Sequence, residues 1–552
     1  MTNRHAQDID PIRLEVMKNA FDAIADEMAL MLMRAAYSPI VRDSMDYSTA
    51  ICDANGQTLA QGVTTPMHLG SFYDAMQYLI TTFENDIHPG DTFIANDPYA
   101  AAGQHLPDIY IIEPIFHDDV LVGWTTTLAH HADVGGIVPG SNAMGAVEIY
   151  QEGLRLPFLK LVERGKPNEA IWSIIRLNVR IPEMVEGDLR AQMAASHAGR
   201  RSFLDLVERY GIDDVLACAE ELHNYAERLG RAEIRDLPKG TYRFTDHLDG
   251  LGETPETITI QLAVTIHEET ISVDFEGTSP QVAGGLNTPL PFTKASVYTA
   301  LRSIMQSEIP NCHGFERVVE VTAPKGTLVN SVHPAPCGAR GITGYRTIDA
   351  MFGALAQAVP DRVTADGMGG STIPTFSGVH EGKAFVFSET AMGTWGATSA
   401  HDGQVGVPHM GANQANVPIE MIEANYPLRI RQYGIAPDTG GAGKFRGGNA
   451  FIREYEYIGE TDGLFSLRSD KRKHLPHGLF GGENGTAPVN LLITEQGEQE
   501  LPVMVTNPHV IRKGDVFRHI SPSGGGFGPA EERDPSLIEA DMEAGLITSD
   551  AR

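Results

Sequence analysis

Apolar residues near the start of the chain recur with the period of an α-helix. The stripe consists of Met17, Phe21, Ile24, Met28, Met31 and Ala35, at alternating spacings of four and three residues. Asp10–Pro11 suits a helix start, because proline is tolerated in the first turn, and Ser38–Pro39 suits the end. The pattern predicts one long amphipathic helix between these prolines.

Over residues 47–150 the pattern changes to short apolar strands separated by glycine, proline and aspartate. Clear examples are residues 91–95, 109–115 and 121–128. Residues 169–232 are predicted to be helical again, with a break near Gly211. The amphipathic stretches there are residues 186–210 and 213–229.

The clearest β pattern lies in the middle of the chain. Apolar and polar residues alternate strictly over 258–266, and a second short run follows at 271–275 after a polar turn. This alternation predicts a hairpin with one buried face. Beyond it the sequence predicts a helix over 346–359, then a long Gly-rich and strand-like region, and a short surface helix within 534–552.

The charge balance excludes some classes of partner. The chain has 552 residues, with 42 Lys+Arg against 72 Asp+Glu, for a formal net charge of −30. A nucleic-acid backbone would be repelled by this field, and the densest basic run, residues 468–473, contains an aspartate and is interpreted as a solvated turn. With no run of about 18 apolar residues, no membrane-spanning segment is expected either.

Cysteine usage points to a reducing compartment. Cys52, Cys218, Cys312 and Cys337 are scattered and form no CxxC pair. Four cysteines are sparse for a disulfide-stabilised protein of this size, and the first residues lack an apolar signal region, so a cytoplasmic protein is expected. Cys337 has no recognisable histidine partner, which disfavours a role as nucleophile.

Glycine-rich segments do not form a nucleotide motif. Gly443–Lys444 resembles part of a P-loop, but Asp438 stands where the first glycine is required and Phe445 where serine or threonine is required. No GxGxxG follows a predicted strand. A nucleotide site within this chain is therefore not expected.

The strongest candidate chemistry is spread over three loops. These are the segment with Asp43 and Asp46, residues 96–108 and residues 129–136. Histidines and carboxylates at strand ends suit a divalent ion such as zinc, manganese or iron. The alternative is that these side chains cap turns and accept backbone N–H groups, and the spacing alone does not decide between the two.

The residues of these loops differ in how strongly the sequence supports them as ligands or catalytic groups. His105 and Asp108 are three apart across a Leu–Pro corner and can point to one side, and His130 follows an apolar strand that would hold its ring. A spare His131 or Asp133 could act as general base or orient a ligand. The support for Glu152 and Glu389 as site residues is weaker. Three further histidines are interpreted as structural: His313, His474 and His477.

The elements together predict a multidomain α+β protein. We expect an N-terminal mixed α/β, metal-bearing domain at 1–235, a β-rich middle domain at 236–345 and a C-terminal Gly-rich α+β domain at 346–552, composed mainly of β structure. The turn 236–240 marks the first boundary. Three domains agree with the length, for which the prior is about three or four.

The motifs resemble those of the hydantoinase B/5-oxoprolinase family, which includes N-methylhydantoinase β-type subunits and subunits of ketone carboxylases. The resemblance extends over nearly the whole chain. Its landmarks are RAAYSPIVRDSMDYS (34–48), NDPYAAAGQHLPD (96–108), AHHADVGGIVPGS (129–141), EIYQEGLRLP (148–157), DFEGTSPQVAGGLNTP (274–289), PIEMIEANYPL (418–428), DTGGAGKFRGG (438–448), PHGLFGG (476–482) and SPSGGGFGPAEERDP (521–535).

The resemblance implies a division of labour between two subunits. A hydantoinase A-type partner would use ATP to phosphorylate the amide oxygen of a cyclic amide, and this chain would bear the metal, zinc or manganese, where water attacks the activated carbonyl. ATP would be used by the partner and not bound here, and an (αβ)2 assembly is expected. The family's ligands map onto Asp46, His105, Asp108 and His130, with His131, Asp133 and Glu152 as candidate catalytic residues.

Two rival functions remain at this level. The chain could be a subunit of an ATP-dependent ketone carboxylase, or a metal-free scaffold, although the intact ligand set argues against the scaffold. The loop 100–104 departs from the family's shorter, glycine-paired version, which leaves the ligands in place but makes the substrate pocket an open question.

Overall fold

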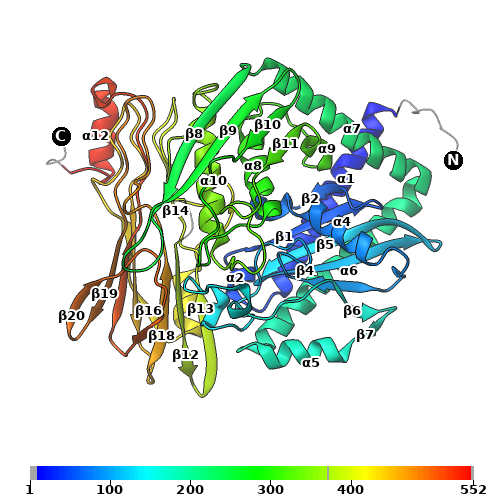
Figure 1. Ribbon diagram of the computed structural model, residues 1–552, viewed down its shortest axis with the longest axis horizontal. Coiled ribbons are helices and arrows are strands. Elements are labelled where there is room, and N and C mark those ends of the chain that lie inside the picture. The colour runs from blue at the N-terminus through cyan, green and yellow to red at the C-terminus, as the bar shows by residue number, and fades with distance from the viewer. Residues whose placement is uncertain (1–8, 370–371, 549–552) are drawn as a thin grey trace.

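The computed structural model describes residues 9–369 and 372–548. Figure 1 shows the N-terminal part of the chain on one side, the C-terminal part on the other, and the middle of the chain between and above them. The helices are α1 (Pro11–Ala35), α2 (Pro39–Arg42), α3 (Pro66–Leu69), α4 (Phe72–Thr82), α5 (Glu169–Asn178), α6 (Pro182–Tyr210), α7 (Ile212–Asp236), α8 (Leu290–Ile304), α9 (His313–Glu316), α10 (Arg340–Leu355), α11 (Ile419–Asn425) and α12 (Pro535–Glu543).

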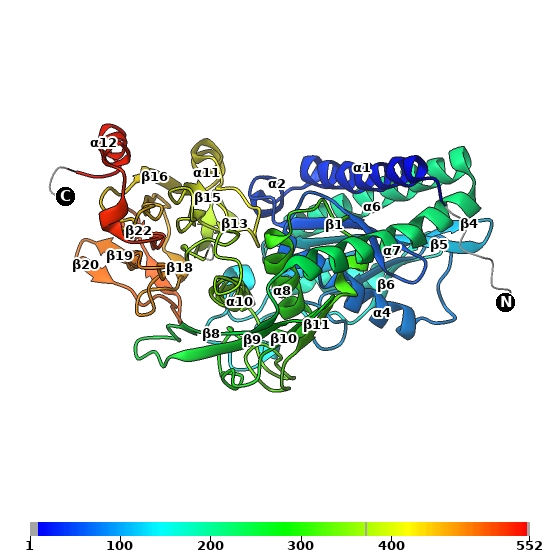
Figure 2. The same ribbon diagram turned by 90° about the horizontal axis from the view of Figure 1, so that it is seen from above.

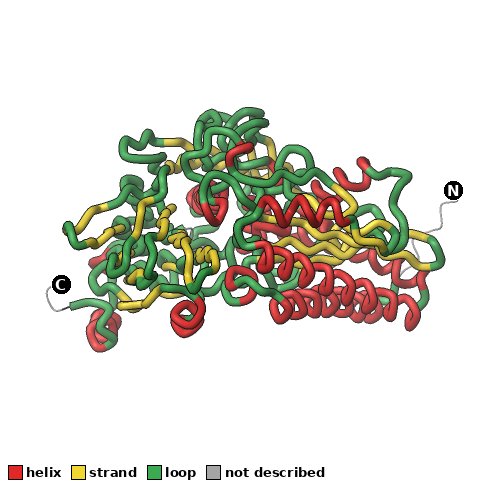
Figure 3. Tube along the Cα trace, turned by 90° about the horizontal axis from the view of Figure 1, so that it is seen from below, coloured by secondary structure: helices red, strands yellow, loops and turns green. Residues whose placement is uncertain are grey.

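The N-terminal part contains an antiparallel seven-stranded sheet in the order β2-β1-β5-β4-β3-β6-β7. Its strands are β1 (Tyr47–Asp53), β2 (Thr58–Gln61), β3 (Thr92–Ala95), β4 (Asp108–His117), β5 (Val120–His130), β6 (Leu159–Glu163) and β7 (Lys166–Pro167). Helices α1 and α6 cover one face and α4 packs on the other (Figure 2). Figure 3 shows the same layering, with strands between helices. Burial on both faces explains why these strands are short apolar runs.

The middle of the chain forms a four-stranded sheet in the order β11-β10-β9-β8. Its strands are β8 (Gly240–Leu248), β9 (Ile258–Ile266), β10 (Ile271–Asp274) and β11 (Val319–Thr322). The predicted hairpin is confirmed, since Ile271 pairs with Ile266 across the turn. Helix α10 packs between this sheet and α8, and every one of its residues is buried.

The C-terminal part contains three further sheets, in the orders β13-β12-β18-β21, β14-β15 and β16-β17-β22-β19-β20. Their strands are β12 (Ile373–His380), β13 (Lys383–Ser388), β14 (Gly393–Thr394), β15 (Val405–Val407), β16 (Leu428–Ile435), β17 (Phe451–Tyr457), β18 (Gly463–Arg468), β19 (Val489–Thr494), β20 (Gly497–Glu500), β21 (His509–Ile511) and β22 (Val516–Ile520). The Gly-rich loops approach each other closely: a Cβ atom on Gly447 would lie 1.9 Å from the carbonyl oxygen of Gly524. Only glycine fits there.

The predicted N-terminal helix is present as α1, with one correction to its buried face. Met17, Phe21 and Met28 are fully buried, whereas Met31 is 38% exposed and Leu32 is 0% exposed. At 3.6 residues per turn the stripe passes closer to position 32 than to position 31. The helix break near Gly211 is confirmed, because α6 ends at Tyr210 and α7 begins at Ile212.

Other expectations differ in their boundaries. Helices α3 and α4 lie inside the region predicted to be only strands, and α10 begins six residues before the predicted start at 346. The predicted boundary between 345 and 346 therefore falls inside a buried helix, whereas that between 235 and 236 falls in the last turn of α7. The predicted C-terminal helix is α12; residues 549–552 lie outside the described part. Across the described residues, no helix combines the length and apolar character that a membrane span requires.

Candidate metal centre

Three neighbouring strands bring the predicted ligands into one row. Asp108 at the start of β4 pairs directly with His130 at the end of β5. On the other side of β5, β1 begins with Tyr47 opposite Ala129, and the N–H of His130 donates to the carbonyl of Asp46 over 3.0 Å. Residues in register on adjacent strands project to the same face. Asp46, His130 and Asp108 therefore gather at one edge of the sheet.

His105 completes a compact cluster with Asp108 and His130. One potential ligand atom from each of the three buried side chains lies within 4.8 Å of the others. His105 Nε2 is 3.1 Å from Asp108 Oδ1, and the rings of His105 and His130 have their centroids 4.9 Å apart. The structure thus brings these three predicted ligands together.

Several polar atoms of the cluster lack hydrogen-bond partners within the described residues. They are Asp46 Oδ1, His105 Nε2, Asp108 Oδ1, and Nδ1 and Nε2 of His130. Leaving buried polar atoms without partners costs about 1–3 kcal/mol each. Imidazole nitrogens and carboxylate oxygens are the donors that zinc and manganese take in proteins. The side chains present therefore fit a divalent cation.

The tautomer of His105 also suits a ligand. Its Nδ1 lies 3.2 Å from the carbonyl oxygen of Gly338, which can only accept a hydrogen bond. Nδ1 therefore carries the proton, and the lone pair of Nε2 faces Asp108. A ligating histidine commonly donates its other ring N–H to a backbone carbonyl in this way.

Burial and charge set the protonation of the cluster. Burial lowers the pKa of His105 to about 4 and lowers that of His130 well below its usual value. Burial would raise the pKa of Asp108, but the guanidinium of Arg340, which pairs with it directly, holds that pKa well below its usual range. Burial together with the negative charge of Asp108 raises the pKa of Asp46 to about 7. The imidazoles are therefore neutral at pH 7, as metal ligation requires.

Sequence reasoning missed His68, which lies on α3 beside the cluster. Its Nε2 is 3.6 Å from Asp46 Oδ1 and 3.9 Å from Asp108 Oδ2. Ser48 Oγ donates to the carbonyl of Thr65 over 3.1 Å and lies 3.2 Å from His68 Nδ1, so Nδ1 donates to Ser48 and Nε2 stays free. A single histidine in TTPMHLG has no spacing relationship that would have revealed it.

The second group missed is cationic. Arg340 and Arg468 reach the cluster from α10 and the end of β18, and both line a small cavity beside Asp46 and His130. The cavity has a volume of about 20 Å³, which is room for one water molecule or ion. Burial, followed by repulsion from Arg340, lowers the pKa of Arg468 to about 10. The cavity thus combines ligands with positive charge.

A much larger cleft lies on the other side of α3. It has a volume of about 970 Å³ and is lined by Pro66, Tyr298 and Met410, among others. Met67 and His68, the neighbours of Pro66, line the small cavity instead. Helix α3 is therefore a wall between the cleft and the candidate metal centre.

Loop 100–104 is hydrogen-bonded to helix α3. The side-chain amide of Gln104 donates to the carbonyls of Met67 and His68 over 3.2 Å and 3.1 Å, and to Ser71 Oγ over 2.7 Å. Loop 100–104 departs from the pattern of the family that the motifs resemble, and this loop therefore contacts α3.

Two predicted catalytic residues lie away from the cluster. His131 follows His130 and projects to the opposite face, where its Nε2 is 3.0 Å from Gln192 Oε1 on α6. Asp133 accepts from the backbone N–H groups of Gly135 and Gly140 and pairs with Arg180 at 2.8 Å. Asp43 likewise pairs with Arg42 at 2.9 Å. The structure does not bring these side chains to the metal candidates.

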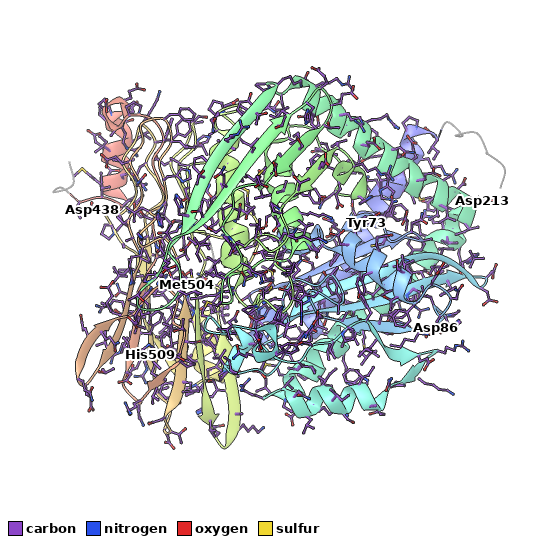
Figure 4. All side chains as sticks on the ribbon, viewed as in Figure 1. Tyr73, Asp86, Asp213, Asp438, Met504 and His509 are labelled. Carbon is purple, nitrogen blue, oxygen red and sulfur yellow. The ribbon has the colours of Figure 1, made fainter. Side chains whose placement is uncertain are left out.

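The remaining candidates have structural contacts. His313 stacks on Tyr73, which is labelled in Figure 4, with ring centroids 4.1 Å apart. Glu389 accepts a hydrogen bond from Tyr455 over 2.6 Å and pairs with Arg453. Cys337 is fully buried, and burial raises its pKa to about 12, which makes it a poor nucleophile.

Comparison with known proteins identifies the family. The family described as hydantoinase B/oxoprolinase matches residues 10–530. The chain belongs to this family. The resemblance noted in the motifs is therefore confirmed over nearly the whole length.

The proteins that are similar to this chain carry different names. A protein named as the B subunit of a putative D-/L-hydantoinase, from Pseudomonas sp. (strain NS671), is 35% identical, over 98% of this chain and 94% of that protein. The beta subunit of the caprolactamase of Pseudomonas jessenii is 33% identical over 98% and 95% of the two chains. The crystal structure of the ATP-dependent caprolactamase from that organism superposes with a TM-score of 0.92 at 32% identity, over 99% of this chain and 96% of the other.

A nucleotide-free structure of acetone carboxylase also has a TM-score of 0.92, but at 19% identity, over 98% of this chain and 79% of that one. This likeness shows a shared fold. The caprolactamase superposition likewise shows that its mixed α and β architecture with several sheets is shared by this chain.

Proposed function

We propose that this chain is the metal-bearing B subunit of an ATP-dependent cyclic amidohydrolase. The observation that carries the proposal is the buried cluster of His105, Asp108 and His130, whose facing ligand atoms make no hydrogen bond within the described residues. Identity of 33–35% to the B subunit of a putative hydantoinase and the beta subunit of a caprolactamase supports the substrate class. We place the enzyme in the cytoplasm and infer an A-type partner in an (αβ)2 assembly.

The need for two subunits follows from the chemistry of amides. An unstrained cyclic amide is resonance-stabilised and a poor electrophile, so both the carbonyl and the attacking water need activation. In the proposed reaction the partner transfers the γ-phosphoryl group of ATP to the amide oxygen and ADP leaves. Water then adds to the carbonyl carbon, and the C–N bond of the ring breaks as the nitrogen takes up a proton and leaves as an amine. A second water hydrolyses the remaining acyl phosphate to the carboxylate and inorganic phosphate. A zinc or manganese ion, when bound, supplies Lewis acidity, which lowers the pKa of water and polarises oxygen.

The side chains of this subunit have separate tasks in the proposal. Asp46, His105, Asp108 and His130 hold the ion. Arg340 keeps Asp108 ionised through their ion pair. His68 directs Nε2, the ring nitrogen without a proton, at the cavity, where it would accept a hydrogen bond from water. The 970 Å³ cleft is large enough to hold a small cyclic amide, but α3 separates it from the proposed ligands, so no step of the proposed reaction is assigned to it. Catalytic roles for His131, Asp133 and Glu152 remain predictions.

The first experiment is a measurement of metal content. The purified chain is analysed for transition metals beside the variants His105→Gln, His130→Gln and Asp46→Asn. His519→Gln is the matched control, because His519 is also buried but belongs to the C-terminal sheet. We expect about one zinc or manganese per chain in the wild type and the control, and at least a tenfold loss in the three variants. A wild type without metal, alone and with its partner, contradicts the proposal.

Activity then separates amide hydrolysis from carboxylation. Together with an A-type subunit and ATP, the chain is assayed on hydantoins, 5-oxoproline and caprolactam, and on acetone with bicarbonate. Ring opening that His105→Gln abolishes supports the amidohydrolase. Bicarbonate-dependent carboxylation without ring opening would support the ketone carboxylase, whose fold this chain shares.

A further inference from the structure

Glu152 binds a backbone segment that reaches the candidate metal centre. The residue follows the short 3-10 helix η2 (Ile149–Gln151) and is 1% exposed. Its Oε2 accepts the N–H of Cys337 over 3.0 Å, and its Oε1 accepts the N–H of Gly338 over 2.6 Å. The two carboxylate oxygens thus hold two successive peptide groups.

The segment that Glu152 holds contacts two of the proposed ligands. The carbonyl of Gly338 accepts from His105 Nδ1 over 3.2 Å and from Arg468 over 3.3 Å. Two residues later, at the start of α10, Arg340 forms its ion pair with Asp108. A displacement of this short segment therefore changes the orientation of His105 and the charge partner of Asp108 together.

We propose that Glu152 is a positioning residue for the metal centre. Its carboxylate fixes the Cys337–Gly338 peptide so that the Gly338 carbonyl holds His105 with Nδ1 protonated and Nε2 directed to the ion. This inference rests on the proposed function and assigns Glu152 a role different from that of a catalytic base. A base needs an oxygen directed at the reacting water, and both oxygens of Glu152 already accept backbone N–H groups.

The packing around Gly338 makes the contact specific. A Cβ atom at Gly338 would lie 2.9 Å from Glu152 Oε1 and 3.4 Å from the backbone nitrogen of Ala143. The close approach of the carboxylate therefore depends on glycine. A Gln at position 152 keeps the size but has only one acceptor oxygen, so its NH2 group would face one of the two N–H donors. One peptide would then lose its partner.

The test measures metal binding, which the proposal predicts will change without loss of the fold. Wild type and Glu152→Gln are stripped of metal, and their affinities for Zn2+ and Co2+ are measured by chelator competition. The matched control is Asp249→Asn, because Asp249 is a buried carboxylate that also accepts backbone N–H groups, from Arg472 over 2.6 Å and from His474 over 3.0 Å. We expect 10–100-fold weaker binding for Glu152→Gln and less than a twofold change for the control.

The visible spectrum of the Co2+ form provides a signature of the ligand geometry. We expect a changed spectrum in Glu152→Gln and an unchanged spectrum in Asp249→Asn, with similar Tm values for the two variants. Gly338→Ala displaces the same contact from its other side, so it should weaken binding in the same way and keeps the test valid if Glu152→Gln fails to fold.

The outcomes separate this inference from the proposed function. Wild-type affinity and spectrum in Glu152→Gln or in Gly338→Ala would overturn the positioning role while the metal centre stands. A wild type that binds neither Zn2+ nor Co2+ would overturn the proposed function and the inference with it.

Discussion

Asp46 and Asp108 show how two interacting buried carboxyl groups reach different charge states. Both are buried, which by itself raises a carboxyl pKa. Asp108 has Arg340 as a direct partner and stays ionised, and its charge in turn raises the pKa of Asp46 to about 7. Two such groups titrate as a pair. A divalent cation among them would favour the ionised form of both.

Glu113 lies away from the candidate metal ligands and allows a test of how burial changes a carboxyl pKa. It lies on β4, with Arg200 at 3.8 Å, and burial raises its pKa from 4.5 to about 7. Between these two pH values Glu113 binds more protons in the folded state than in the unfolded state. The contribution of Glu113 to the free energy of unfolding therefore falls as pH rises. Glutamine does not titrate. We therefore expect Glu113→Gln to gain about 3 kcal/mol of stability relative to wild type between pH 4.5 and pH 8.

The measurement is the difference in thermal unfolding between wild type and variant at several pH values. Glu163→Gln, at an exposed glutamate at the end of β6, is the control and should show no such trend. A difference between wild type and Glu113→Gln that stays constant with pH would contradict the raised pKa.

At the scale of secondary-structure elements, α10 connects two buried charge clusters. Arg340 in its first turn pairs with Asp108 at the candidate metal centre. Further along, Arg346 pairs with Asp470 at 2.7 Å, and Asp349 accepts from Lys471 over 2.7 Å. A helix that is buried all round has no solvent-facing side, so these charges must find partners inside the protein. The helix therefore couples the centre to the C-terminal part.

Lys471 is the residue with which to test this network. It is 1% exposed and donates to Asp349, Asp366 and the carbonyl of Gly367. Lys471→Met leaves the carboxylates buried without their cation, which typically costs about 3–5 kcal/mol. We expect a clear fall in the urea midpoint. Lys383→Met, at an exposed lysine of β13, should change stability by less than about 0.5 kcal/mol. Equal midpoints for the two variants would contradict a stabilising network.

Element boundaries were predicted best where one face of an element is buried, and less well in a helix that is buried all round. The alternation in β9 and the stripe in α1 produced visible periods, because solvent lies on one side of each. Helix α10 is enclosed by protein, so its start at Arg340 has no amphipathic boundary. Helices α4 and α8 went unpredicted for a different reason, since the short apolar runs around them do not distinguish helix from strand.

At the scale of the whole molecule, the candidate metal centre combines side chains from segments that are far apart in the sequence. The proposed ligands belong to the predicted N-terminal domain, but Arg340, Gln414 and Arg468 also line the cavity. The hydrogen-bonded pair of Arg340 and Asp108 is separated by 232 residues in sequence. The predicted domain 1–235 therefore carries the ligands without the whole of their surroundings.

The proposed division of labour between subunits makes a prediction about the isolated chain. Because its sequence has no P-loop and no GxGxxG after a strand, we expect no ATP hydrolysis above background from the purified chain. Addition of an A-type subunit and a cyclic amide should produce ATP hydrolysis coupled to ring opening. The A-type subunit alone is the control. Robust ATP hydrolysis by this chain alone would contradict the proposed roles.

The sequence by itself determined the family, the amphipathic elements and the candidacy of His105, Asp108 and His130, because motifs and short-range periodicity are local properties. The family resemblance placed His130, and not His131, among the ligands. The tertiary structure decided where the two rings lie, because side chains alternate along an extended chain, so His130 meets Asp108 and His131 meets α6. It also decided that His68 and Arg340 lie beside these side chains. Such contacts between distant segments depend on how the sheets and helices pack, which no local pattern encodes.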